Sequence, residues 1–118
     1  MYGLQVGIDL SFFLGRSLTQ ICIGANELIL NFDSDVSVTV ESRIGLTSPG
    51  ADTEQFDDLR ASGALLVGLL ERHVATVEGR PEGTLRLQFE TGHILEFYDS
   101  SQAYESYQVR NGSDLIIV

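Results

Sequence analysis

The chain has 118 residues and is 43% hydrophobic, a size and composition typical of one globular domain spanning 1–118. Its 17 acidic side chains outnumber 7 basic ones, all arginine, which gives a formal net charge of −10. Such a charge repels nucleic acid and anionic lipid at long range, so we expect neither as a partner, whereas a basic protein would be attracted.

Alternating apolar residues in the first part of the chain predict a series of strands. Residues 2–10 place an apolar side chain at every even position, and the runs 18–24, 27–33 and 36–42 alternate in the same way. The breaks between these runs, GAN and DSD, are short and rich in turn-forming residues. We therefore predict antiparallel strands joined as a meander.

The middle of the chain predicts one helix near 52–71. Asp52 or Thr53 can cap its first turn, and Glu54 favours the positive end of the helix dipole. Apolar residues then recur every three or four positions as far as Leu70. The ASGA stretch is a poor helix interior, so we expect an interruption there.

Strand patterns resume after the predicted helix. They are carried by the segments VATVE, TLRLQFE, ILEFYD, SYQVR and LIIV. Asn111 and Gly112 precede the last segment and predict a tight hairpin, because such a turn requires positive φ angles. The predicted fold class is therefore α+β, with about eight or nine strands in mainly antiparallel β meanders and a single helix.

The two halves of the sequence resemble each other, which suggests an internal duplication. The aligned segments are 13–21 with 69–77 and, after one inserted residue, 28–40 with 85–97. Any two meanders share alternation. Alternation alone does not explain why Arg16 and Arg72 occupy the same position before the first strand of each half. The repeat halves are about 13–42 and 69–99, and we expect their apolar faces to pack on each other.

No pattern in the sequence predicts a metal, a cofactor or a catalytic centre. His73 and His93 lack the close-spaced partners that zinc sites use, and their roles stay open. No nucleophile motif is present, so a non-catalytic protein is favoured over an enzyme. Cys22, the one cysteine, lies between isoleucines and is expected to be a buried thiol. Without a signal peptide or a long apolar segment, the chain is expected in the cytoplasm.

The segment YDSSQAYESYQV, residues 98–109, holds the best candidate binding site. Its candidate side chains are Tyr98, Asp99, Tyr104, Glu105 and Tyr107. Tyr104 and Tyr107 would form an amphipathic patch if a turn brought them to one face. The alternative is a structural corner, with the tyrosine rings in the core and their hydroxyl groups bonded to backbone or carboxylate oxygens.

Four stretches of the chain carry a family resemblance. They are FLGRSLTQICIG, GALLVGLLERHV, GTLRLQFETGHILEFYDSSQAYESYQV and the terminal IIV. Together they resemble a family of small uncharacterised bacterial proteins, mainly actinobacterial, that share LLGRxV and YDSSxxYESYxI stretches. The chain departs from this pattern at Glu71, where glycine is common, and at His93. Because the family carries no established activity, the resemblance implies a compact bacterial domain and transfers no catalytic residue.

Three classes of function remain open. The first is a non-catalytic protein-interaction module for a basic partner, for example an immunity protein that neutralises a basic toxin. The second is a small-ligand or anion binder, or an enzyme, with a pocket between the two repeats where Arg16 and Arg72 converge. The third is a homo-oligomeric structural protein, such as a homodimer joined through edge strands like LIIV. We favour the first.

Overall fold

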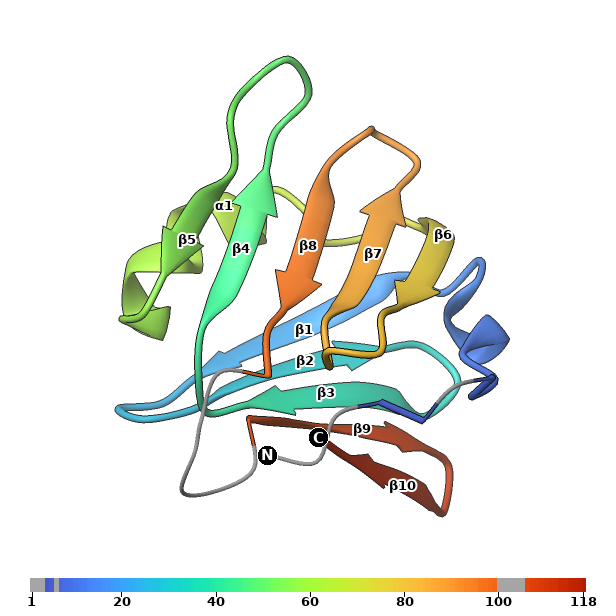
Figure 1. Cartoon of the computed structure of the whole chain (residues 1–118). Helices are drawn as coiled ribbons and strands as arrows, with labels where there is room; N and C mark the ends of the chain where they lie inside the picture. Colours follow the sequence, from blue (N-terminus) through green and yellow to red (C-terminus); the bar gives the residue numbers. More distant parts are fainter. Residues whose placement is uncertain (1–3, 6, 100–105) are drawn as a thin grey trace.

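Ten strands in two antiparallel sheets make up most of the structure (Figure 1). The computed structural model describes residues 4–5, 7–99 and 106–118, and this count refers to them. The strands are β1 (Leu18–Ile23), β2 (Leu28–Phe32), β3 (Val36–Val40), β4 (Ile44–Thr47), β5 (Glu54–Phe56), β6 (Val74–Gly79), β7 (Leu85–Phe89), β8 (Ile94–Phe97), β9 (Tyr107–Asn111) and β10 (Asp114–Ile117). The helical segments are η1 (Ser11–Phe13), η2 (Leu59–Ser62) and α1 (Gly63–Val67).

The predicted fold class is confirmed, since the described chain is mainly antiparallel strand with one short α-helix. The first sheet has the order β1-β2-β3-β9-β10, and the second has the order β5-β4-β8-β7-β6. Each alternating run predicted after residue 17 lies on a strand, whereas β4 and β5 were not predicted. The strands of the two sheets run in crossing directions, with one sheet behind and below the other (Figure 1).

The helix predicted near 52–71 is wrong in extent. Only η2 and α1 are helical, and the beginning of the predicted segment is strand β5 instead. In β5, Phe56 lies opposite Ile44 and packs against the core. Pairing with β4 therefore outweighs the local helical pattern, because a strand at this position extends the sheet and places Phe56 against apolar neighbours.

The cap of the helical segment also differs from the prediction. Asp58, and not Asp52 or Thr53, caps η2 by accepting a hydrogen bond from the backbone N of Arg60 over 3.1 Å. The α-helix that follows spans five residues. It begins at Gly63, within the ASGA stretch where an interruption was expected, and the chain there changes from a 3-10 to an α-helix.

The strand predicted at the N-terminus is wrong at the residues that the structure describes. Gly7 has a φ of +79°, and the N–H of Ile8 donates to the carbonyl oxygen of Gln5 over 3.3 Å. A turn therefore breaks the alternating run, which glycine permits because it has no Cβ. Leu4 and Leu10 are nevertheless buried, so the apolar residues of this segment still serve the core.

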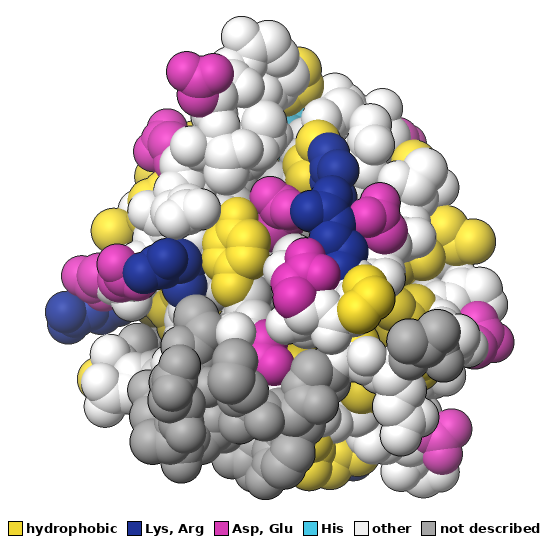
Figure 2. All heavy atoms as spheres, viewed as in Figure 1, with side chains coloured by type: hydrophobic (Ala, Val, Ile, Leu, Met, Phe, Trp, Pro, Cys, Tyr) yellow, Lys and Arg dark blue, Asp and Glu magenta, His cyan; other side chains and the backbone are white. Residues whose placement is uncertain are grey.

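Inward-facing side chains of both sheets form one core cluster. In β2, β3 and β7, buried and half-buried residues alternate strictly, as expected for strands with one face on the core. The outward face of the second sheet carries charge instead, because Glu78, Arg86 and Glu96 lie side by side across β6, β7 and β8. Figure 2 shows basic and acidic side chains side by side on this side of the molecule.

The two halves of the chain exchange strands between the sheets. Strands β1 to β3 lie in the first sheet and β4 and β5 in the second, whereas β6 to β8 lie in the second and β9 and β10 in the first. Each sheet therefore has three strands from one half and two from the other, in matching order. The register also shifts at matching positions, after Leu18 in β1 and after Val74 in β6. An origin by duplication stays a prediction.

The beginnings of β1 and β6 meet where the two halves cross. Ser17 and His73 lie opposite each other in an isolated antiparallel bridge. The flanking backbone bonds run from Leu18 N to Arg72 O over 3.2 Å and from Val74 N to Arg16 O over 2.9 Å. These reciprocal bonds join the two sheets at one point.

The predicted hairpin at Asn111 and Gly112 is present between β9 and β10. Gly112 has a φ of +60°, as such a turn requires. Asn111 is the last residue of β9 and pairs with Asp114, so the two loop residues are Gly112 and Ser113. The prediction that Asn111 also takes a positive φ is wrong.

Candidate functional site

Tyr107, one of the candidate binding residues, lies in the core. Its side chain is 1% exposed, and its hydroxyl group donates to the carbonyl oxygen of Gly83 over 2.6 Å. Burial raises the pKa of the Tyr107 hydroxyl above its ordinary value, and the carboxylate of Asp99 adds to this effect. Through this hydrogen bond Tyr107 connects β9 to the turn between β6 and β7. Its buried side chain is not accessible to a binding partner.

Tyr98 and Asp99 lie at the end of β8 and are half-buried. The Tyr98 hydroxyl donates to Oε1 of Glu96 over 3.2 Å, and burial, followed by the charge of Glu96, raises its pKa. Asp99 accepts a hydrogen bond from the Ser106 hydroxyl over 3.0 Å. These contacts agree with the alternative of a structural corner, in which the hydroxyl groups bond to backbone or carboxylate oxygens. Tyr104 and Glu105 lie outside the described residues.

Arg16 and Arg72 flank the crossing point of the two halves. The guanidinium group of Arg16 donates to the carbonyl oxygen of Phe12 over 3.0 Å and to the Ser34 hydroxyl over 2.9 Å. Arg72 is exposed, and its backbone carbonyl accepts the bond from Leu18. Neither arginine lines any of the three clefts that are described below.

The two histidines lie on separate strand ends. Nδ1 of His73 is 3.4 Å from Oε2 of Glu90, and hydrogen bonding to His73 is the main cause that lowers the pKa of Glu90. Nδ1 of His93 is 2.6 Å from the hydroxyl of Thr91. Within the described ranges, no three histidine, cysteine or carboxylate side chains gather as metal ligands. Cys22 is half-buried, which differs from the buried thiol expected.

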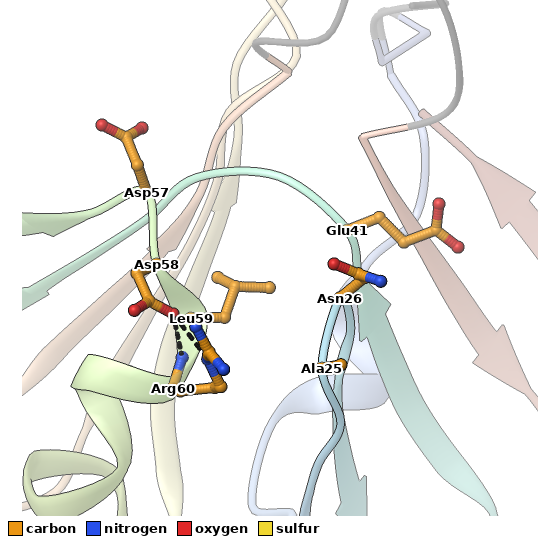
Figure 3. A pocket seen from close by; sticks show the side chains of 7 residues that line it. All are labelled: Ala25, Asn26, Glu41, Asp57, Asp58, Leu59 and Arg60. Atoms are coloured by element: carbon orange, nitrogen blue, oxygen red, sulfur yellow. Dashed lines mark hydrogen bonds and ion pairs between the residues drawn. The ribbon is translucent and has the colours of Figure 1, made fainter.

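A groove lined by carboxylates, which the sequence did not predict, lies between the β1–β2 turn and the β5–η2 connection (Figure 3). One cleft of about 450 Å³ occupies the space between these two segments. A second cleft of about 400 Å³ shares three of its lining residues and continues along the β1–β2 turn. We call the two together the acidic groove, lined by Gly24, Ala25, Asn26, Glu27, Glu41, Asp57, Asp58, Leu59 and Arg60.

The side chains of the acidic groove divide into an apolar part and a charged rim. Leu59 points into the space between the two segments, whereas the carboxylates of Asp57 and Glu41 point away from it (Figure 3). Asp58 binds Arg60 through the 3.1 Å contact with its Nε, and this hydrogen bond is the main cause that lowers the pKa of Asp58. Leu59 itself is 7% exposed, so the groove has a buried apolar anchor beside exposed charge.

The carboxylates of the groove are only partly neutralised. Asp57 contacts Arg43 over 2.7 Å, and Asp58 contacts Arg60. Glu27 and Glu41 are exposed, and neither forms an ion pair with any residue that the structure describes. The groove therefore presents uncompensated negative charge next to apolar surface, which is the combination that a long basic side chain can use.

A third cleft, of about 480 Å³, lies between the N-terminal segment and β6. Its lining is largely apolar, with Ile8, Leu10 and Leu14 on one side and Val77 and Gly79 on the other. The described residues that line it include no charged side chain. Among them there is no group for acid–base chemistry.

The acidic groove has little signal in the sequence. Asp57 and Asp58 fall within the helix predicted near 52–71, where they would lie off its apolar stripe and face solvent. Asn26 and Glu41 come from two other turns, which the pairing of β2 with β3 brings close together. Both line the same cleft as Asp58.

Residues 11–118 match a family described as a family of unknown function (DUF6188), so the chain belongs to this family. The family shown agrees with the resemblance inferred from the sequence to an uncharacterised family. No match to the chain was found among curated proteins or among solved structures. No helix in the described part of the chain is long and apolar enough to cross a membrane.

Proposed function

We propose that this chain is a non-catalytic protein-interaction module that binds a basic segment of a partner protein through the acidic groove. The observation that carries the proposal is the pair Glu27 and Glu41, two exposed residues that line the groove and have no ion-pair partner among the described residues, with the Glu41 carboxylate directed outward at the rim. The net charge of −10 adds a long-range attraction for such a partner.

An arginine or lysine side chain fits the two parts of the groove. Its aliphatic stem would pack against Leu59 and Ala25, which line the space between the two segments. Its charged head would reach the rim, where Glu41 accepts charge-assisted hydrogen bonds. Attraction between exposed charges is screened by salt, so binding is expected to weaken as ionic strength rises.

The concrete version of this proposal is an immunity-type protein of the bacterial cytoplasm that neutralises a basic toxin. Its support is the acidity of the chain, which accelerates encounter with a basic protein. The alternative pocket for an anion at Arg16 and Arg72 has less support, because Arg16 is already engaged by Phe12 and Ser34. An enzyme is likewise less supported, since no described cleft brings a serine, threonine or cysteine together with a basic catalytic group.

Binding of a hexa-arginine peptide, measured by fluorescence anisotropy at low salt, tests the groove. The double variant Glu27→Gln and Glu41→Gln is expected to weaken binding about fivefold to tenfold, because it removes both unpaired carboxylates. Arg60→Ala is expected to strengthen binding, because Arg60 is the one basic residue among the described residues that line the groove. Raising the salt concentration should weaken binding to all of these proteins.

Two controls separate the groove from the general charge of the molecule. Glu82→Gln removes a carboxylate that lines none of the three clefts, and Arg110→Ala removes an arginine of the first sheet. Both should leave the affinity for the peptide within about twofold of that of the original chain, since they change the net charge but remove no group that lines the groove. If the double glutamate variant weakens binding no more than two such control changes do, the groove is not the site.

A further inference from the structure

We infer that β10 is a self-association edge, through which two copies of the chain pair as antiparallel strands into one continuous sheet. This inference is independent of the proposed function. Strand β10 lies at the end of the first sheet, and among the strands that the structure describes it pairs with β9 alone. Leu115 is 44% exposed and Ile117 is 39% exposed, although both are large apolar residues on a strand.

The other three sheet edges differ from β10. The β1 edge lies near α1, where Ile23 approaches Gly63 so closely that a Cβ there would lie 3.1 Å from it. The β6 edge is approached by the N-terminal segment, since Leu4 and Leu10 pack on Gly79. The β5 edge is three residues long and exposes two polar side chains. Ile23 on the β1 edge is exposed as well, but its side chain adjoins Gly63 of α1, whereas β10 carries two exposed apolar residues on one face.

The hydrogen-bonding pattern of the hairpin leaves β10 groups free to pair. In a two-residue hairpin the closing pair, here Asn111 with Asp114, is hydrogen-bonded, and hydrogen-bonded and non-hydrogen-bonded pairs then alternate. The backbone groups of Leu115 and Ile117 therefore point away from β9. Apart from the strand pairing itself, the described part of the chain gives no backbone hydrogen bond to either residue.

These free groups are self-complementary. When β10 is placed antiparallel to a second copy with the twofold axis at Ile116, Leu115 of each copy lies opposite Ile117 of the other. Both pairs then use outward-pointing backbone groups, and each brings two exposed apolar side chains together. Ile116, which packs partly against the core, would meet its own copy on the inner face.

The charge distribution also favours this edge. The outward residues of the first sheet are Gln20, Cys22, Ile29, Asn31, Ser37, Thr39, Gln108, Arg110, Leu115 and Ile117, none of which is acidic. In a chain with a net charge of −10, a face without carboxylates is where two copies repel each other least. Asp114 is the one charged residue of β10, and the register places it outside the two central pairs.

Sedimentation equilibrium of the full chain from about 5 to 500 µM tests the inference. A paired edge buries far less than the roughly 1,600 Å² of a standard interface, so we expect a dimer with a Kd on the order of 10–1,000 µM. Because salt screens repulsion between the two acidic copies, the dimer should become tighter between about 0.02 and 0.3 M NaCl. Binding of a basic peptide by the groove is expected to change in the opposite direction.

Leu115→Lys and Ile117→Lys are each expected to weaken the dimer at least about tenfold, since they place a charge on the apolar pairs. The matched control is Gln55→Lys on β5, which adds the same charge at another edge and should leave the dimer unweakened. Circular dichroism checks that each variant folds, which exposed positions should allow. A chain that stays monomeric throughout this range, or a dimer that all three variants change equally, would overturn the inference.

Discussion

Gly15 and Glu71 adopt the same left-handed backbone conformation at matching positions of the two halves, with φ angles of +77° and +67°. Each lies just before the crossing point and donates its backbone N–H to the opposite half, Gly15 to Val74 O over 2.8 Å and Glu71 to Leu18 O over 2.7 Å. Glycine adopts this conformation without strain, whereas glutamate does not, because its Cβ crowds the following carbonyl.

Replacement of Glu71 by glycine should therefore stabilise the protein. We expect the free energy of unfolding to rise by about 0.5–1 kcal/mol, since the relief of strain exceeds the added freedom of the unfolded chain. Urea unfolding measures this change. Gly15→Ala is the matched opposite: no atom lies within 4 Å of its added Cβ, so a loss of about 1 kcal/mol would come from the backbone alone. A destabilised Glu71→Gly variant would contradict the argument.

Removal of the buried Tyr107 hydroxyl should destabilise the protein. Tyr107→Phe leaves the carbonyl of Gly83 without this hydrogen bond, and Gly83 is buried. An unsatisfied buried acceptor costs about 1–3 kcal/mol, so the midpoint of urea unfolding should fall accordingly. An unchanged midpoint would show that the contact contributes nothing net to folding.

The same hydroxyl should make the protein sensitive to alkaline pH. The folded chain raises the pKa of Tyr107, so the folded state keeps the proton that the unfolded state loses near its ordinary pKa of about 10. Stability is therefore fully present below about pH 10 and falls as pH rises above it, by up to about 1.4 kcal/mol per pH unit. Tyr107→Phe lacks this contribution, and its unfolding free energy, measured from pH 8 to 11, should fall less steeply. Tyr98, whose pKa is also raised, accounts for part of the slope that remains.

Gly45 and Tyr98 should show strong energetic coupling. The Tyr98 ring lies over Gly45 in β4, so a Cβ at this position would overlap the Tyr98 hydroxyl. Gly45→Ala is expected to cost about 1–3 kcal/mol, as overpacking does, because Tyr98 must move. In a Tyr98→Ala background the same change should cost much less, and a double-mutant cycle of thermal or urea unfolding measures the difference. Equal costs in the two backgrounds would show that the ring does not restrict this position.

Much of the fold could be predicted from alternation, because strands with one buried face repeat every two residues. Val36, Val38 and Val40, for example, are all buried in β3 as their spacing indicates. Where long-range pairing competes with local pattern, the prediction fails. Phe56 lies in a helical pattern yet pairs with Ile44, and the turn at Gly7 breaks an alternating run.

The candidate site was harder to predict than the fold. For the tyrosine-rich segment the sequence allowed both a surface patch and a structural corner, and Tyr107 alternates inward on β9 and is buried. The acidic groove joins Asn26, Glu41 and Asp58, which only the sheet topology brings together. Nothing in the spacing of these residues along the chain indicates that they share a cleft.

Amide chemical-shift mapping during titration with a hexa-arginine peptide tests the acidic groove most directly. We expect shift changes concentrated at residues 24–27, at Glu41 and at residues 57–60, which line the groove. These changes should shrink in the Glu27→Gln and Glu41→Gln double variant and on addition of salt. Changes spread evenly over the acidic surface, or concentrated at residues outside the groove, would contradict the claim that this groove binds a basic partner.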